Sequence, residues 1–264
     1  MPSVERWIDH TPMSDPEGHA AVIADLSANI GLLNGFVQGV LVHSDWLNAY
    51  GLDDADYRTV SRATLPVAER LDAIFEKDAQ HLQIPRPPSK RAVGTCRDFA
   101  LMLCSFLRCK GIPARVRCGF AAYFSNPWED HWVCEYWDER SRRWLLSDPQ
   151  IDELLKDRCR IEFDPTDVPR RAFLTAGQAW IDCRNGRSDP THFGHGEVTG
   201  SWFIKVNVLR DHYVLNARET SAWDRWRAAP LPRRVIGAHE IALLDDLAAC
   251  PEQQLVEVVP DWLG

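Results

Sequence analysis

Apolar residues near the middle of the chain recur with a helical period. They lie at Phe99, Met102, Leu103, Phe106 and Leu107, a spacing that places them on one face of a helix. Gly111 and then Pro113 predict the end of this helix, because glycine commonly follows a last helical turn and proline cannot continue one. The pattern therefore predicts a helix with one buried face that ends shortly before residue 111.

The residues that follow change to patterns typical of strands. Small or apolar residues alternate with arginine and glycine over 114–122, which is the period of a strand. A turn at Ser125-Asn126-Pro127 precedes a second strand, which begins near His131 and runs to Trp137. A charged hairpin turn leads to a third strand over 143–148. Pro149 closes it, because proline cannot donate to a sheet. We expect an antiparallel sheet beside the helix.

Three residues at the ends of these elements can perform nucleophilic catalysis. Cys96 lies in or just before the first helical turn, where unpaired N–H groups and the helix dipole favour a thiolate. A cysteine nucleophile needs a base, and the base needs an orienting group. We interpret His131 as the base and Asp148 as the group that orients it. The backbone N–H of Cys96 is a natural oxyanion donor, and attack on an amide would give a thioester.

The segments around these residues resemble the transglutaminase-like superfamily. Four sequence motifs occur in the family's order over about residues 91–151: GTCRDFA, GIPARVRCGF, DHWVCEYW and RWLLSDPQ. The resemblance implies an α+β fold with a papain-like core, in which a catalytic helix packs on an antiparallel sheet with flanking helices, and it implies no cofactor. The superfamily includes crosslinkers, hydrolases, acyltransferases and inactive members. A second oxyanion donor usually comes from an upstream side chain, for which Gln80, Gln83 and Trp46 are candidates.

Several residues have an alternative, structural interpretation. Glu135 shares a strand face with His131 and either lines the cleft or forms a cross-strand salt bridge with an arginine. The spacing of His192 and His195, with Asp189 nearby, is compatible with a metal site, but a plain turn is favoured and no metal is expected. The other cysteines are expected in the core, because free cysteine is among the most buried residue types: Cys104, Cys109, Cys118, Cys134, Cys159, Cys183 and Cys250.

The flanks of the catalytic segment are predicted to be mainly helical. We expect one domain over 1–264, with a catalytic core at about 85–155, a helical N-terminal segment 1–84 and a mainly helical C-terminal extension 156–264. Gly31, Gly35 and Gly39 recur at every fourth position and predict a close approach of another backbone. Expected helices cover 20–41 with interruptions, 66–76, 172–181, 203–218 and 237–249, with an extended connector at 84–89 and an aperiodic loop at 184–201.

Composition narrows the function further. The 264 residues are 45% hydrophobic, enough for one large core, and the formal charge of −8 disfavours a nucleic-acid binder. The first residues lack the apolar run of a signal peptide, no stretch of about 18 apolar residues occurs, and no C-x-x-C pair is present. We therefore expect a cytoplasmic enzyme acting on a peptide, protein or amide-bearing small molecule, without nucleic-acid or membrane partners. The main alternative is an inactive transglutaminase-like binding module.

Overall fold

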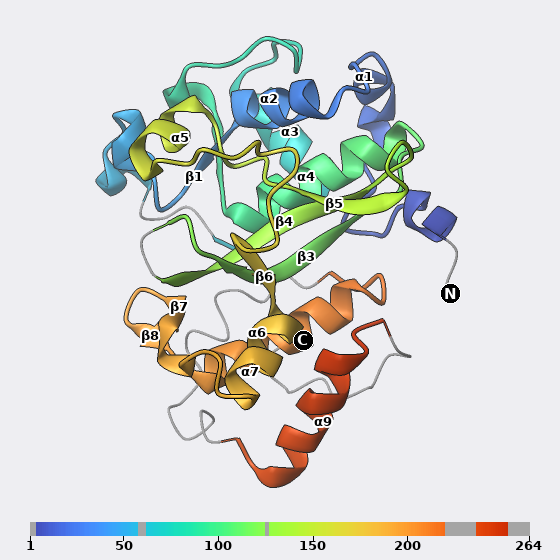
Figure 1. Cartoon of the computed structure of the whole chain (residues 1–264). Coiled ribbons are helices and arrows are strands. Elements are labelled where there is room, and N and C mark those ends of the chain that lie inside the picture. The colour runs from blue at the N-terminus through green and yellow to red at the C-terminus, as the bar shows by residue number, and fades with distance from the viewer. Residues whose placement is uncertain (1–3, 58–61, 125–126, 220–235, 253–264) are drawn as a thin grey trace. The chain divides into compact units, whose positions relative to one another are not determined.

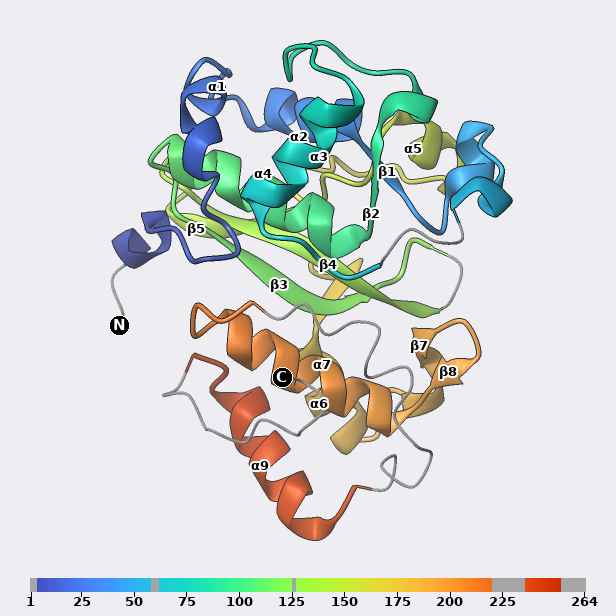
Figure 2. The same ribbon diagram turned by 180° about the vertical axis from the view of Figure 1, so that it is seen from behind.

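The computed structural model describes residues 4–57, 62–124, 127–219 and 236–252. Figures 1 and 2 show it from opposite sides. The chain forms two compact units. The first unit comprises residues 1–116, 133–156 and 163–168, and the second comprises 117–132, 157–162 and 169–264. Each unit therefore combines segments that are far apart in the sequence.

The first unit contains the helices that come earliest in the chain. These are α1 (Ala20–Ala24), α2 (Ile30–Val40), α3 (Val67–Lys77) and α4 (Cys96–Cys109). β1 (Leu41–His43) and β2 (Ala92–Gly94) pair in parallel. α5 (Glu153–Cys159) passes from the first unit into the second. Short 3₁₀ helices of this unit lie at Val4–Ile8, Glu17–His19, Leu47–Tyr50, Asp54–Tyr57 and Pro88–Lys90. Another, at Pro190–His192, belongs to the second unit.

The larger sheet is mixed and is built mainly from antiparallel pairs. In the order in which neighbours pair, its strands are β6 (Phe173–Thr175), β3 (Ala114–Ala121), β4 (Trp128–Asp138), β7 (Phe193–His195) and β8 (Val198–Thr199). β5 (Arg143–Ser147) pairs with β4, so that Cys134 lies opposite Ser147 and Asp138 opposite Arg143. Helices combined with this sheet confirm the predicted α+β class.

Helix α4 is the central element of the first unit. Figures 1 and 2 show it between the layer formed by α2 and α3 and the strands β4 and β5. The sequence predicts one buried face, but every residue from Cys96 to Arg108 is buried. Polar side chains on the other face find partners inside the unit; for example, Arg108 donates from Nε to the Ala114 carbonyl at 2.9 Å. The helix is therefore enclosed by neighbours rather than lying on a surface.

In the second unit, α6 (Ala176–Arg184), α7 (Ser201–Val214) and α9 (Ala238–Ala249) pack against one another. Residues 202–214 of α7 are all buried. The apolar core of this unit includes Phe120, Phe193 and Phe203, whose rings make edge or tilted contacts. Because α7 is buried on every side, its apolar residues do not form a stripe along one face. The helical periodicity of its apolar positions is therefore weak.

The structure corrects several expected boundaries. Residues 173–175 form β6 because they pair with 119–121 of β3, so the helix expected at 172–181 begins only at Ala176. The aperiodic loop at 184–201 contains β7 and β8. Of the three spaced glycines, only Gly39 lies against another backbone, since a Cβ there would be 3.1 Å from the Cα of Pro85. The expected turn residues Ser125 and Asn126 lie outside the described part of the chain.

Close backbone approach at Gly119 gives a first testable prediction. A Cβ at Gly119 would lie 2.1 Å from the carbonyl oxygen of Leu174, so Gly119→Ala must push β3 and β6 apart. We expect a loss of about 1–3 kcal/mol in the free energy of unfolding, measured by urea denaturation. Gly35→Ala is the matched control, because it lies in α2 with no atom within 4 Å of the added Cβ. It should stabilise by roughly 0.5–1 kcal/mol, and equal losses in both variants would contradict this explanation.

Candidate active site

The start of α4 is held by hydrogen bonds within the residues that surround Cys96. The carboxylate of Asp98 accepts the backbone N–H of Thr95 at 2.8 Å and the Thr95 hydroxyl at 3.1 Å. The Asp98 amide in turn donates to the Thr95 carbonyl at 2.9 Å. These contacts fix the first helical turn, because donors at a helix start have no partner within the helix. Cys96 is the first residue of that turn and is buried.

A cation from another helix balances the charge of Asp98. Arg70 of α3 places its Nη2 atom 2.7 Å from Oδ1 of Asp98, and its Nη1 atom donates to the Val93 carbonyl at 2.9 Å. Both side chains are almost wholly buried, at 8% and 1% exposed. An uncompensated carboxylate two residues from Cys96 would oppose formation of a thiolate, so Arg70 removes an unfavourable charge from the helix start. Neither Arg70 nor Asp98 was predicted from the sequence to support the site, although the T-x-x-D pattern at Thr95 and Asp98 is typical of a capping box.

Space at the same turn is limited by Gly94. A Cβ on Gly94 would lie 3.0 Å from the Cβ of Asp98, so a larger residue would displace the carboxylate from Thr95. Gly94 also ends β2 and pairs with His43 of β1. The local geometry thus explains the residue types at Gly94, Thr95 and Asp98.

The end of β1 brings a histidine, His43, beside β2 and Phe99 of α4. His43 lies opposite Gly94 in the β1–β2 pair, and the Ser44 amide donates to the Gly94 carbonyl at 2.9 Å. The His43 ring packs near that of Phe99, with centroids 6.3 Å apart. Its Nδ1 atom accepts the Asp45 amide at 3.1 Å, which makes Nε2 the protonated nitrogen of the neutral ring. No sequence pattern indicated this residue, since the partner strand lies some fifty positions away.

Asp148 lies one residue beyond β5 and is completely buried in the first unit. Its backbone N–H donates to the Pro165 carbonyl at 2.8 Å, and its Oδ1 atom accepts the Gln150 amide at 3.0 Å. The preceding Ser147 is held by Asn34 of α2, whose Nδ2 atom lies 3.0 Å from the serine hydroxyl. A carboxylate fixed in this way has a restricted orientation, as a residue that aligns an imidazole requires.

His131 lies on β4, in the part of that strand that belongs to the second unit. It is buried, and the two residues before it on β4 bind side chains of α7 and β7. Oδ1 of Asp130 accepts a hydrogen bond from Nδ2 of Asn207 at 2.7 Å, and Glu129 forms an ion pair with Nδ1 of His195 at 2.5 Å. These contacts attach the strand that carries His131 to α7 and to β7.

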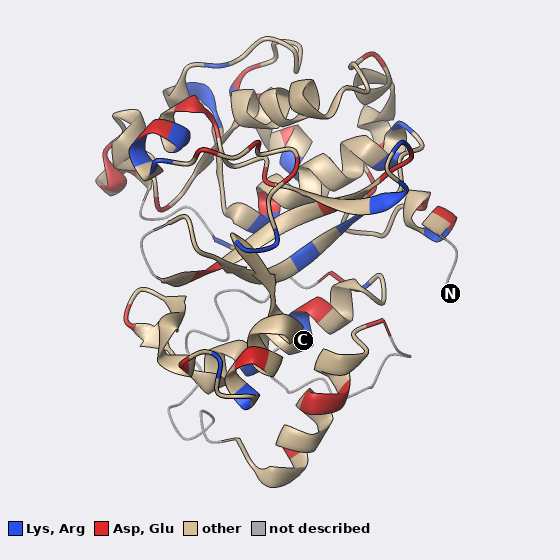
Figure 3. Cartoon of the chain, viewed as in Figure 1, with Lys and Arg blue, Asp and Glu red and all other residues tan. Residues whose placement is uncertain are grey.

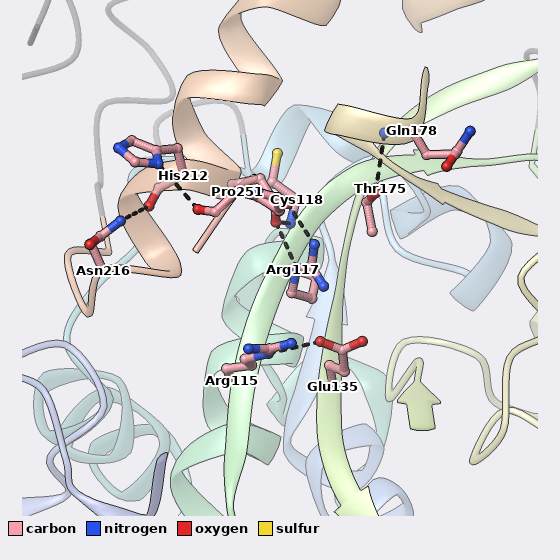
Figure 4. A network of polar contacts seen from close by, with 10 residues as sticks. Arg115, Arg117, Cys118, Glu135, Thr175, Gln178, His212, Asn216 and Pro251 are labelled. Carbon is pink, nitrogen blue, oxygen red and sulfur yellow. Dashed lines mark hydrogen bonds and ion pairs between the residues drawn. The ribbon is translucent and has the colours of Figure 1, made fainter. Parts of the chain in front are cut away.

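Helix α7 also binds β3 through charged groups. The carboxylate of Asp211 pairs with Nε and Nη2 of Arg117 at 2.9 and 2.7 Å, and it accepts the Cys118 amide at 3.0 Å (Figure 4). Asn207, one turn earlier, contacts the Gly119 carbonyl at 3.4 Å as well as Asp130. One face of α7 therefore carries the polar groups that hold β3 and β4 in the second unit.

The three candidates for a second oxyanion donor lie in different surroundings. Gln80 and Gln83 are exposed, and their side-chain amides donate to Asp78 at 3.4 Å and to the Asp25 carbonyl at 3.3 Å. Trp46 is half-buried and lies three residues beyond β1, and its backbone N–H donates to the His43 carbonyl at 3.0 Å. Since β1 pairs with β2 immediately before Cys96, the position of Trp46 in the fold favours it over the two glutamines.

Two other predicted residues are engaged in structural contacts. Glu135 forms a buried cross-strand ion pair with Nε of Arg115 at 2.8 Å, which is the structural alternative considered for it (Figure 4). His195 pairs with Glu129, and in the described parts of the chain no three His, Cys, Asp or Glu side chains are grouped to hold a metal. Of the remaining cysteines, three are buried in the core as expected (Cys104, Cys118 and Cys134), three are half-buried (Cys109, Cys159 and Cys183), and Cys250 is exposed.

The distribution of charges and the lengths of the helices can be read from the described part of the chain. Figure 3 shows acidic and basic residues interspersed along the ribbon. Among the helices that the structure describes, none has both the length and the apolar character needed to cross a membrane.

Comparisons with known proteins show a similarity over part of the chain. Residues 52–149 match the model of the transglutaminase-like superfamily. A crystal structure of a proposed cysteine protease from Cytophaga hutchinsonii is 13% identical, with a TM-score of 0.39, over 66% of this chain and 46% of that one. The present chain thus spans less than half the length of that protein. No curated protein matches the chain.

The Arg70–Asp98 pair gives a second prediction. Arg70→Met should lower the free energy of unfolding by about 3–5 kcal/mol, because it leaves a buried carboxylate without its counter-ion. Arg143→Met is the matched control, since Arg143 pairs with Asp167 at 3.1 Å where both side chains are well exposed. We expect at most about 1 kcal/mol there. Thermal and urea unfolding of both variants measures the difference, and similar losses in the two would show that the buried pair is not required.

Proposed function

We propose that this chain, whose residues 52–149 match the model of the transglutaminase-like superfamily, catalyses cysteine-dependent acyl transfer or hydrolysis at an amide bond. In the proposal, Cys96 is the nucleophile, His131 the acid and base, and Asp148 the residue that orients the imidazole. The substrate is a peptide, a protein or a small molecule that bears an amide. The single observation that carries the proposal is the position of Cys96 at the first residue of a helix whose start is fixed by Thr95, Asp98 and Arg70.

The helix start supplies two features that this chemistry needs. Backbone N–H groups of the first turn have no acceptor within the helix, so the amide of Cys96 is available for a developing oxyanion. The helix dipole favours negative charge at the same end, which supports a thiolate. The ion pair of Asp98 with Arg70 removes the opposing charge.

The residue types and their order support the assignment of the other two residues. His131 lies on β4, and Asp148 directly follows Ser147, the last residue of β5. A cysteine nucleophile needs a base, and the base needs a carboxylate that orients it.

The proposed reaction proceeds in two balanced steps. The Cys96 thiolate attacks the amide carbonyl carbon, a C–S bond forms, and the C–N bond breaks as the His131 imidazolium gives its proton to the leaving amine. Water or a second amine then attacks the thioester and gives its proton to His131. The C–S bond breaks and the thiolate–imidazolium pair is restored. Water yields an acid, and an amine yields a new amide.

A second function has a specific motivation in the same family, which includes members without activity. A binding module would retain α4 and the sheet but would need no reactive thiol. Ordinary reactivity of Cys96 together with tight binding of a peptide would favour that alternative, so the reactivity of Cys96 separates the two functions.

The third prediction concerns this reactivity. The competing thiols are suppressed, since burial raises the pKa of Cys109, Cys134 and Cys159, and it raises that of Cys183 to about 11. In a Cys250→Ser background, which removes the exposed thiol, we expect iodoacetamide to label Cys96 selectively at about pH 6.5, roughly two units below an ordinary thiol pKa. Mass spectrometry locates the modified residue.

Replacing the proposed base provides the control for this labelling experiment. His131→Ala should slow labelling of Cys96 at low pH, because the thiolate loses its cationic partner. Labelling should recover near pH 9, where an ordinary thiol ionises by itself. Unchanged labelling at low pH would remove His131 from the proposed site, and failure to label Cys96 in the parent protein would remove the enzyme hypothesis.

The fourth prediction tests Trp46 as the second oxyanion donor. Trp46→Phe keeps an aromatic ring but removes the indole N–H, and it should lower Cys96-dependent release of p-nitrophenol from p-nitrophenyl acetate by about 100- to 1,000-fold. Alkylation of Cys96 by iodoacetamide should not change, because that reaction forms no oxyanion. Gln83→Ala is the control and should retain the parent rate. A rate loss in the glutamine variant, with none in Trp46→Phe, would reverse the assignment.

A further inference from the structure

The imidazole of His131 is enclosed by aromatic rings of its own unit. The ring of Phe124 lies 5.0 Å away between centroids, that of Tyr123 at 5.8 Å and that of Phe173 at 6.5 Å. All three make edge contacts, with interplanar angles of 68°, 83° and 73° respectively. Three aromatic rings therefore lie beside the proposed acid and base.

Pairing of β3 with β6 fixes these rings. Ala121 lies opposite Phe173, and the Ala122 amide donates to the Ala172 carbonyl at 2.9 Å just before Tyr123. Tyr123 and Phe173 are buried, whereas Phe124 is half-buried. Phe124 also packs on Tyr123, with centroids 4.7 Å apart. Phe124 thus retains surface that could contact a substrate, while the two buried rings support it.

The chemistry of the proposed function determines which part of a substrate would meet this surface. His131 gives its proton to the nitrogen of the departing amine, so that nitrogen must approach the imidazole. An attacking amine must surrender its proton at the same place, since the second step is the reverse of the first in form. Side chains that surround the imidazole therefore contact the amine component and not the acyl component.

We propose that Phe124, supported by Tyr123, binds the amine side of the substrate and selects amines that carry an aromatic or branched aliphatic group. This inference rests on the proposed function. An apolar group gains contact area against the rings, whereas a carboxylate would lose hydration there without an ion-pair partner among these rings. A second cation would be repelled by the imidazolium.

An acyl-enzyme assay tests this selectivity without knowledge of the natural substrate. p-Nitrophenyl acetate would acetylate Cys96 and release p-nitrophenolate, after which phenethylamine, ethanolamine or β-alanine competes with water for the acetyl group. Each amine is supplied at the same concentration of its unprotonated form, and mass spectrometry quantifies the N-acetyl product against acetate. The same competition with an acetyl thioester of free cysteine gives the intrinsic reactivity of each amine. After division by that reference, we expect the yield of N-acetyl product to be about tenfold higher for phenethylamine than for ethanolamine or β-alanine.

Variants show whether Phe124 is responsible. In Phe124→Ala the tenfold preference should disappear, and in Phe124→Leu part of it should remain, because leucine keeps an apolar surface. The measured quantity is a ratio of products, so a general loss of activity cancels. Phe75→Ala is the matched control: Phe75 is also half-buried and stacks on a histidine, His19, with centroids 5.4 Å apart, but it lies on α3 of the first unit. The preference should persist there.

The outcomes separate the two hypotheses. Equal p-nitrophenol release by the parent and by Cys96→Ala would remove the proposed function, and this inference with it. Cys96-dependent release without a preference among the amines would overturn the inference and leave the proposed function standing. A preference that survives in Phe124→Ala would likewise overturn the assignment to Phe124.

Discussion

The buried ion pair between Arg70 and Asp98 is the interaction on which the start of α4 depends. Asp98 holds the Thr95 amide and hydroxyl, and Arg70 holds both Asp98 and the Val93 carbonyl. Two charges removed from water cost several kcal/mol each unless they are paired and fully hydrogen-bonded. The arrangement therefore tolerates little displacement, and it couples α3, β2 and α4 two residues from Cys96, the proposed nucleophile. The pair thus fixes the orientation of that helix start.

Helix α7 serves the second unit in a comparable way. Its Asn207 and Asp211 side chains bind Asp130, Arg117 and the backbone of residues 118 and 119. These partners lie on β3 and on the part of β4 that carries His131. The family match ends at residue 149, whereas α7 begins at Ser201. The C-terminal segment therefore provides attachment points for the histidine strand that the family segment does not contain, and its role extends beyond covering the sheet.

Apolar and charged surroundings serve different parts of the proposed mechanism. Around Cys96 the chain places backbone donors and a balanced ion pair. Around His131 it places the edges of aromatic rings. Strong electrostatic interactions require both features, because charge attraction increases as water is removed. In the proposed mechanism, the aromatic neighbours of His131 would both surround the acid and base and supply a surface for substrate selection.

Local patterns were sufficient for α4, β3, β4 and β5, since each depends on periodicity and on stop signals such as Gly111. They were also sufficient to propose Cys96, His131 and Asp148, because the residue types and their order are typical of one chemistry. Tertiary structure alone decided that residues 173–175 form a strand, that His43 lies beside Gly94, and that Arg70 neutralises Asp98. Each of these depends on a partner about 30 to 55 positions away, which no local pattern can identify. A sequence specifies which side chains are available, but only the fold determines which of them meet.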